Sequence, residues 1–373
     1  MGRLPIDSCT STRVVMEGRE FLAFGGCNYL GLADQAPVQD ALIQGLARFG
    51  ISTTASRETT GNTLAHETLE GELSAFTQQE ACILTAEGYT ANFACMQGLA
   101  REIGVALIDQ RAHRSIRDAA VSVGMQVFEF EHLSPRAASW LVRQHADAGV
   151  AIMTDSVFAA DGAIAPLPDL LALLPAQRSA LVVDDCHGFG VLGDRGQGAV
   201  AHFGLDDPRI VITTTLAKGL GCYGGAVLGR GELIRKIRER AWVYRNSTPV
   251  PPALAQAARA ALAMVTADRT LVVALRRNIA LVRDTLGRLG FALPPEPVPI
   301  FTFALESEQR MQEVYRRLLE SGVLIPLIDY PGGPAPRYFR LVVTAAHSPG
   351  DIERLSRELA VAMAGTAPAG VAS

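Results

Sequence analysis

The residue whose position most plainly suggests chemistry is one of two lysines. Basic side chains number 34 against 38 acidic ones, yet lysine occurs only at Lys218 and Lys236. Lys236 lies among alternating charges at helical spacing, which is typical of a solvated helix face. Lys218 follows the apolar run IVITTTLA and precedes the glycine-rich GLGCYGG. It is therefore either an ordinary surface-loop lysine or an amine at a strand end, where α/β sheets bind ligands and a desolvated lysine can form a Schiff base.

Two glycine patterns suggest a competing function, a nicotinamide-dependent enzyme. GFGVLG at 188–193 and GLGCYG at 219–224 both fit GxGxxG after an apolar run. The dinucleotide fingerprint also requires a helix that begins at the pattern. The turn-like DRGQGAV follows the first pattern and the strand-like GAVLG follows the second. Neither continuation is the required helix, so the sequence disfavours a nicotinamide site.

Three other stretches carry side chains or backbone groups suited to a charged cofactor. VVDDCHG at 182–188 places two carboxylates at the end of an apolar run. Such a carboxylate either caps a turn or faces a cation, and the pyridinium nitrogen of pyridoxal phosphate is such a cation. GYTANF at 88–93 opens a helix whose backbone amides suit a phosphate. His113, in DQRAHRSI, is either a loop histidine or a ring that lies flat on an aromatic group.

The elements that must position these residues alternate between helices and buried strands. Apolar, β-branched-rich runs, typical of strands buried on both faces, are ACILT (81–85), VALID (105–109), VAIMTD (150–155), ALVVDD (180–185), RIVITT (209–214) and GAVLG (225–229). With helices between them they predict an α/β fold with a mostly parallel sheet. The prolines of STPVPP interrupt this pattern, and beyond them we expect a smaller α+β domain. The predicted segments are an N-terminal segment (1–36), a large domain (37–250) and a small C-terminal domain (251–373).

Composition excludes several classes of protein. The chain is 49% hydrophobic and 19% charged, with a formal net charge of -4, so we expect neither disorder nor nucleic-acid binding. No apolar stretch approaches the roughly 18 residues of a membrane span, and no signal peptide is evident. Six scattered cysteines form no CxxC pair and no metal-ligand spacing with histidine. The expectation is a cytoplasmic protein without a disulfide framework, membrane span or metal site.

The ordered motifs together resemble the α-oxoamine synthases, pyridoxal-phosphate enzymes of the aspartate-aminotransferase fold (fold type I). The resemblance runs from about residue 24 to residue 358. It rests on NYLGLA (28–33), TTG with HETLEGEL (59–73), EGYTAN (87–92), SVFAADG (156–162), VDDCHGFGVLG (183–193), TTLAKGLG (214–221) and RLVVTAAHS (340–348). It implies an enzyme that joins a small amino acid to acyl-CoA, or to a carrier-bound acyl thioester, with loss of carbon dioxide to give an α-aminoketone. It also implies a homodimer with shared active sites.

The resemblance assigns the catalytic roles residue by residue. Lys218 matches the lysine that forms the Schiff base with pyridoxal phosphate, and Asp184 matches the partner of the pyridine nitrogen. His113 matches the histidine that stacks on the ring, and His187 the one that hydrogen-bonds near the phenolic oxygen. The expected phosphate contacts are Gly88, Tyr89, Thr215 and, from the second subunit, Thr248. The expected contacts to the amino-acid carboxylate are Asn28 and Arg340, since a guanidinium meets a carboxylate bidentately.

Departures from the family pattern leave the substrate open. Ala159 stands where relatives usually have a serine near the cofactor. CHGFGVLG (186–193) and KGLGCYGGAVL (218–228) are most similar to the 8-amino-7-oxononanoate synthase branch, which joins alanine to a pimeloyl thioester. Ser56 and Arg57, however, stand where that branch has a histidine. That branch, and an aminotransferase or racemase on the same fold, therefore remain alternatives.

Overall fold

The computed structural model describes residues 5–364, and its contacts divide the chain into two compact units. The larger unit comprises Asn28–Phe158 and Ala163–Val272. The smaller unit comprises the chain up to Cys27, Ala159–Gly162 and the chain from Val273 onward. Residues 1–4 of the predicted N-terminal segment and residues 365–373 of the predicted C-terminal domain lie outside the described residues.

These units have different boundaries from the predicted segments. Helix α11 (Pro252–Ala267), assigned from sequence to the small domain, packs instead against helix α1 (Ala36–Phe49) in the larger unit. The two helices approach closely because Gly45 has no side chain. A Cβ at Gly45 would lie 2.6 Å from the Cα of Ala253. The proline run at 247–252 therefore marks a bend within the larger unit rather than its end.

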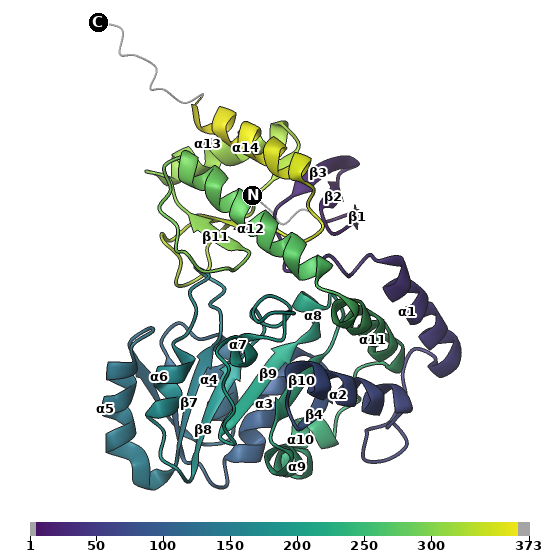
Figure 1. Ribbon diagram of the computed structural model, residues 1–373, viewed down its shortest axis with the longest axis vertical. Helices are drawn as coiled ribbons and strands as arrows, with labels where there is room; N and C mark the ends of the chain where they lie inside the picture. The colour runs from purple at the N-terminus through teal and green to yellow at the C-terminus, as the bar shows by residue number, and fades with distance from the viewer. Residues whose placement is uncertain (1–4, 365–373) are drawn as a thin grey trace, which may run out of the picture. The chain divides into compact units, whose positions relative to one another are not determined.

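A seven-stranded sheet forms the centre of the larger unit (Figure 1). Its strands, in spatial order, are β4 (Ala81–Thr85), β10 (Gly225–Gly229), β9 (Ile210–Thr215), β8 (Ser179–Asp184), β7 (Val150–Asp155), β5 (Val105–Asp109) and β6 (Gln126–Phe130). All are parallel to one another except β10, which is antiparallel to both neighbours. The α/β class and the mostly parallel sheet are thus confirmed. Strand β6 is not among the predicted runs, because it is an edge strand with exposed Gln126 and Glu129.

Helices flank this sheet. Besides α1 and α11 they are α2 (Leu64–Thr77), α3 (Gly88–Leu99), α4 (Arg114–Ser122), α5 (Pro135–His145), the 3-10 turn η1 (Ala146–Ala148), α6 (Leu167–Ala172), α7 (Ala199–His202), α8 (Leu216–Gly219), α9 (Gly231–Arg240) and α10 (Trp242–Arg245). One core cluster joins α3, α4 and α9 to the sheet through buried side chains such as Ala94, Ile116, Val182 and Ile237. Because side chains alternate along a strand, Val182 and Asp184 lie on the same face of β8, and Asp185 continues the alternation toward the opposite face.

Within the described residues, the smaller unit contains two small sheets and three helices. One sheet has β1 (Ser8–Cys9), β2 (Arg13–Met16), β3 (Arg19–Ala23) and β12 (Val323–Leu324), and the other has β11 (Ile300–Phe303), β14 (Tyr338–Val342) and β13 (Leu327–Ile328). Its helices are α12 (Thr270–Arg288), which begins in the larger unit, α13 (Glu308–Glu320) and α14 (Pro349–Ala364). A smaller α+β unit is therefore present as predicted. The strands β1, β2 and β3 belong to it, because β3 pairs in parallel with β12.

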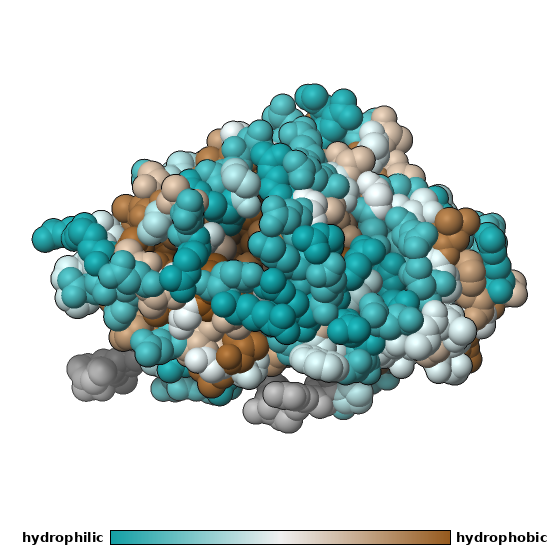
Figure 2. Space-filling model, turned by 90° about the horizontal axis from the view of Figure 1, so that it is seen from below, coloured by the Kyte–Doolittle hydropathy of each residue, from teal (hydrophilic) through white to brown (hydrophobic). Residues whose placement is uncertain are grey.

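The surface seen in Figure 2 is mainly hydrophilic, with apolar side chains in separate patches. Within residues 5–364, no helix combines the length and apolar character needed to cross a membrane.

Candidate active site

Several of the predicted site residues of the larger unit lie where its parallel strands end. β7 ends at Asp155 and β8 at Asp184, and these two residues are paired across the sheet. β9 ends at Thr215, and Lys218 follows within α8. Because β10 is antiparallel, its first residue pairs with the last residues of both β9 and β4, so the start of α3 also lies at this edge. The carboxyl edge of a parallel sheet is the usual ligand site of α/β proteins.

Lys218 contacts a second predicted site residue directly. Its Nζ lies 2.8 Å from Nε2 of His187. The other ring nitrogen of His187, Nδ1, lies 2.5 Å from the phenolic oxygen of Tyr29. Tyr29 is fully buried and His187 is 8% exposed. The structure thus joins the predicted pair and adds a tyrosine that the motif NYLGLA contains but that sequence reasoning did not single out.

The two glycine patterns pack against each other rather than opening helices. Gly190 has φ +82°, and a Cβ there would lie 2.7 Å from the Cα of Gly219. A Cβ at Gly219 would in turn lie 2.5 Å from the carbonyl oxygen of Phe189. This close backbone approach explains the glycines without a dinucleotide, and it brings the loop that carries His187 against the turn that carries Lys218.

Asp184 is anchored by two hydrogen bonds. The side-chain amide of Asn92, on α3, donates to its Oδ2 at 2.8 Å, and the backbone N–H of Cys186 donates to its Oδ1 at 3.1 Å. Asn92 is itself fully buried, and its oxygen accepts a 2.7 Å hydrogen bond from the hydroxyl of Thr213. The same amide also donates to Ser115 Oγ at 2.9 Å. Asn92 therefore orients the Asp184 carboxylate through a set of shared hydrogen bonds. In the sequence, only its position within the motif EGYTAN pointed to it.

The same network reaches His113, which caps the start of α4. Its Nδ1 lies 2.7 Å from Ser115 Oγ, and its backbone N–H donates to Asp155 Oδ1 at 3.1 Å. Burial lowers the pKa of the His113 imidazole, although the nearby Asp184 carboxylate opposes this change. Burial, reinforced by the Asp184 charge, raises the pKa of Asp155 well above its usual value. Burial therefore favours the neutral form of the His113 imidazole at the carboxyl ends of the strands.

Asp185 has a separate set of partners. Its Oδ1 accepts a 2.5 Å hydrogen bond from Ser156 Oγ, and its Oδ2 accepts from the backbone N–H of Ala199 at 3.1 Å. The carboxyl group lies so close to Gly188 and Gly198 that a Cβ on either would come within 2.1 Å of it. Burial raises the pKa of Asp185 to about 7. Asp185 thus links the start of the loop that carries His187 to the end of that loop at Ala199.

The start of α3 and the end of β9 form the predicted phosphate region. Gly88 is the first residue of α3, and a Cβ there would lie 2.7 Å from the Cβ of Thr215. The Thr215 hydroxyl accepts from the backbone N–H of Ala217 and caps α8. The partly exposed Tyr89 donates its phenol to Asp118 at 2.7 Å. The Thr215 hydroxyl itself donates to the backbone carbonyl of Gly224 at 3.2 Å, so the backbone N–H groups at the start of α3 are the donors that suit a phosphate group.

The remaining predicted site residues are Thr248, Asn28 and Arg340. Thr248 is exposed in the segment after α10. Asn28 uses its side-chain oxygen to accept from the backbone N–H of Leu32 at 3.0 Å. Arg340, on β14 of the smaller unit, donates from Nε to the carbonyl of Ala159 at 2.9 Å. The phosphate role of Thr248 and the carboxylate roles of Asn28 and Arg340 stay predictions.

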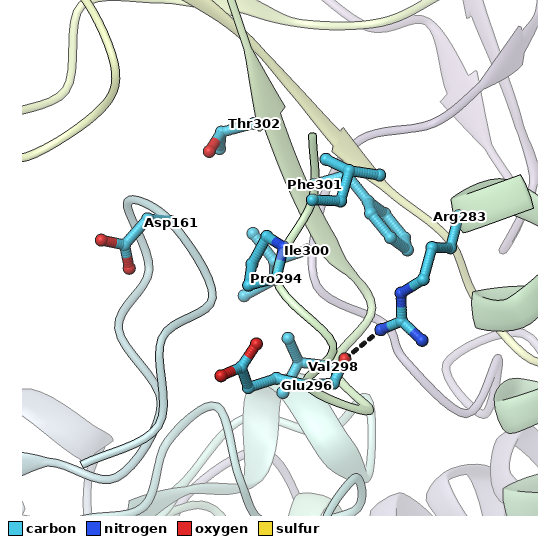
Figure 3. A pocket seen from close by; sticks show the side chains of 9 residues that line it. Asp161, Arg283, Pro294, Glu296, Val298, Ile300, Phe301 and Thr302 are labelled. Carbon is cyan, nitrogen blue, oxygen red and sulfur yellow. Dashed lines mark hydrogen bonds between the residues drawn. The ribbon is translucent and has the colours of Figure 1, made fainter. Parts of the chain in front are cut away.

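A separate pocket lies within the smaller unit and contains none of the predicted site residues (Figure 3). Asp161, Arg283 and Glu296 supply its charged side chains, and Val298 and Ile300 supply apolar ones. Arg283 donates a hydrogen bond to the backbone carbonyl of Glu296. The Arg283 guanidinium thus links two parts of the pocket lining, α12 and the segment around Glu296.

The fold and the lysine-bearing sheet edge define a class of protein, the pyridoxal-phosphate-dependent transferases of fold type I. Comparison with known proteins agrees: residues 19–359 match the family "Aminotransferase class I and II", and the chain belongs to that family.

Within it, the chain is similar to 8-amino-7-oxononanoate synthase of Methylococcus capsulatus, with 35% identity over 360 residues that cover 96% of this chain and 93% of the relative. Its counterpart from Hahella chejuensis is 33% identical over 373 residues, covering 100% of this chain and 94% of the relative. Sphingomonas wittichii serine palmitoyltransferase has a similar structure, with a TM-score of 0.91 and 25% identity, covering 97% of this chain and 92% of that chain. Both kinds of enzyme are α-oxoamine synthases, and this chain is a member of the same group.

Proposed function

We propose that this chain condenses a small amino acid with acyl-CoA or a carrier-bound acyl thioester, releasing carbon dioxide and the thiol to give an α-aminoketone. The observation that carries the proposal is the contact between Lys218 and His187 at the sheet edge that also holds the anchored Asp184 carboxylate. These are the groups that amino-acid chemistry on pyridoxal phosphate needs, namely an amine that can take a proton and a fixed anion.

The residues present fit the cofactor. When bound, pyridoxal phosphate supplies an aldehyde that links to amines and a ring that accepts electrons. Asp184 would hold the proton on the ring nitrogen, because Asn92 and the Cys186 amide fix both of its oxygens. His113 would cover the ring face as a neutral imidazole. The Gly88 end of α3, with the Tyr89 amide and the Thr215 hydroxyl, would hold the phosphate.

Lys218 performs the proton transfers in this proposal. Its amine removes the Cα proton of the bound amino acid and later returns a proton to the product carbon. His187 holds Nζ at 2.8 Å, so the base keeps a defined direction during both transfers. General base catalysis depends on such geometry first and on pKa second. Arg340 and Asn28 would hold the carboxylate of the amino acid, and a guanidinium suits that task.

A narrower candidate is 8-amino-7-oxononanoate synthase itself. The observation that favours it is the 33–35% identity, across nearly the whole chain, to several relatives with that name. An aminotransferase or racemase on the same fold is the other alternative. Release of thiol and carbon dioxide together would exclude the aminotransferase or racemase, and the amino acid and acyl chain that react would show whether the narrower candidate holds.

We also propose that the chain acts as a cytoplasmic homodimer in which Thr248 reaches the partner's phosphate site. Large apolar side chains exposed on the larger unit support a second copy: Ile43, Ile51, Leu64 and Trp242, which are 62%, 81%, 64% and 64% exposed. The six cysteines are free thiols, as suits a reducing compartment. Light scattering of the purified chain, and cell fractionation, test these two points.

The decisive experiment supplies glycine, alanine or serine with acyl-CoA of several chain lengths and measures thiol and carbon dioxide. We expect stoichiometric release of both for one amino acid, and the matching acyl chain identifies the branch. Lys218→Ala should lose this activity and the visible cofactor band. Lys236→Ala is the matched control, because this second lysine pairs with Glu232 on α9. Transamination without thiol release would contradict the proposal.

A further inference from the structure

Tyr29 is the buried residue that the proposed reaction leaves without a role. Its side chain is 0% exposed, and its phenolic oxygen lies 2.5 Å from Nδ1 of His187. The opposite ring nitrogen, Nε2, lies 2.8 Å from Nζ of Lys218. Three residues far apart in sequence therefore form one continuous line of hydrogen-bonding atoms that ends at the proposed catalytic amine.

The chemistry of imidazole couples the two ends of this line. A neutral histidine ring has one N–H donor and one acceptor nitrogen. When Lys218 donates to Nε2, the proton of the ring must be on Nδ1, which then donates to the Tyr29 oxygen. When the lysine amine instead accepts from Nε2–H, Nδ1 carries no proton and accepts from the Tyr29 hydroxyl. A phenol serves in both states because it is a donor and an acceptor.

We propose that Tyr29 is a positioning residue that keeps His187 aligned on Lys218 and lets the histidine tautomer follow the protonation of the lysine. The inference rests on the proposed function, since it concerns the proton traffic of the same amine. A lysine that takes and returns a proton needs a neighbour whose hydrogen bond reverses with it. Burial of Tyr29 keeps water from replacing the phenol at Nδ1.

Other ionisable groups lie near Lys218 and also influence how the site responds to pH. The carboxylates of Asp184 and Asp155 and the groups of His113 and Cys186 all interact electrostatically with either Lys218 or one another. The Tyr29→Phe change leaves all four in place. A shift seen in that variant therefore reports the loss of the phenol rather than a change in these neighbours.

The test compares Tyr29→Phe with a matched control in the cofactor-loaded full chain. The control is Tyr244→Phe, which removes the hydroxyl of another buried tyrosine in the larger unit. Tyr244 is 7% exposed, and the guanidinium of Arg57 lies over its ring. The first readout is the pH at which the visible cofactor band changes. We expect Tyr29→Phe to move this midpoint by about half a pH unit or more, and kcat to fall about 10-fold, the equivalent of one hydrogen bond of about 1.4 kcal/mol. Tyr244→Phe should change neither.

A purely structural tyrosine would lower stability without moving the midpoint, and an unmoved midpoint in Tyr29→Phe overturns the proposal.

The second readout is independent of the reaction. Nitrogen-15 NMR of the histidine rings in the cofactor-free chain, with His187 assigned by its absence in His187→Gln, reports which ring nitrogen carries the proton. In the wild type we expect one tautomer at a given pH, and in Tyr29→Phe an averaged signal from both. Identical nitrogen shifts in the two proteins would refute the inference even if condensation is observed. If condensation is absent but the tautomer depends on Tyr29, the proposed function fails and the coupling stands.

Discussion

Substitution of Asp185 by asparagine should change how the stability of this chain depends on pH. The Asp185 carboxyl group is 2% exposed and has hydrogen bonds from Ser156 and the Ala199 amide. Its pKa is raised to about 7 by burial, against an ordinary 3.8. An acid whose folded pKa is raised contributes stability that is complete below about pH 4 and is lost as pH rises through about 7.

The magnitude follows from linkage. Between pH 5.5 and 8.5, a carboxyl group with these two pKa values loses about 2 kcal/mol of unfolding free energy. Asparagine has nearly the same shape and never ionises. Its amide oxygen can accept from the Ala199 N–H, and its NH2 group can donate to Ser156 Oγ when the serine hydroxyl turns its own proton away. The variant should therefore match the wild type below about pH 4, exceed its stability by about 2 kcal/mol at pH 5.5, and exceed it by about 4 kcal/mol at pH 8.5.

Urea unfolding of the cofactor-free chain at several pH values measures this difference. Asp155, whose pKa burial also raises, contributes equally to both proteins and cancels in the comparison. Asp194→Asn, an exposed change in the same loop, is the control and should follow the wild-type profile. Parallel profiles for Asp185→Asn and the wild type would refute the assignment of the raised pKa to this carboxyl group.

Three other changes test the packing around the site. Asn92→Ala removes a hydrogen bond to the carboxylate at the end of β8, so cofactor affinity in equilibrium titration should fall about 10-fold. Glu70→Ala leaves the buried guanidinium of Arg57 unpaired and should cost about 3 kcal/mol in urea unfolding; an unchanged midpoint would contradict this. Gly88→Ala places a methyl 2.7 Å from a side-chain carbon at the end of β9 and should weaken cofactor retention on dialysis, whereas Gly71→Ala, with open space around it, should not.

The buried strands were predictable because a strand covered on both faces needs a continuous apolar run. VALID and VAIMTD, for example, are strands over the predicted residues, 105–109 and 150–155. Strand β6 escaped because its exposed polar positions break that run. The N-terminal strands escaped for a different reason. They are two to five residues long, and β3 pairs with β12 some 300 residues later in the chain, a contact that no local pattern encodes.

The lysine and the acidic strand end were predictable because their residue types are rare or costly in such places. Lys218 follows one apolar run, and Asp184 and Asp185 end another. Charged side chains in such places are costly to bury, so they indicate a function or a specific partner. Asn92 and Tyr29 gave no such signal, since a buried amide or phenol becomes informative only when its partner is known. Their partners, Asp184 and His187, lie 92 and 158 residues away in sequence. Only the three-dimensional arrangement distinguishes Asn92 and Tyr29 from ordinary core residues.

The adjacent carboxylates at the end of β8 show why position in a strand matters more than residue type. Two buried negative charges side by side would repel each other. Their partners are separate: Asp184 is held by Asn92 of α3, whereas Asp185 is held by Ser156 and Ala199. Asp184 is held at the edge of the sheet where Lys218 also lies, and its role toward a cation stays a prediction. Burial raises the pKa of Asp185 to about 7, although its hydrogen bonds from Ser156 and Ala199 oppose this change.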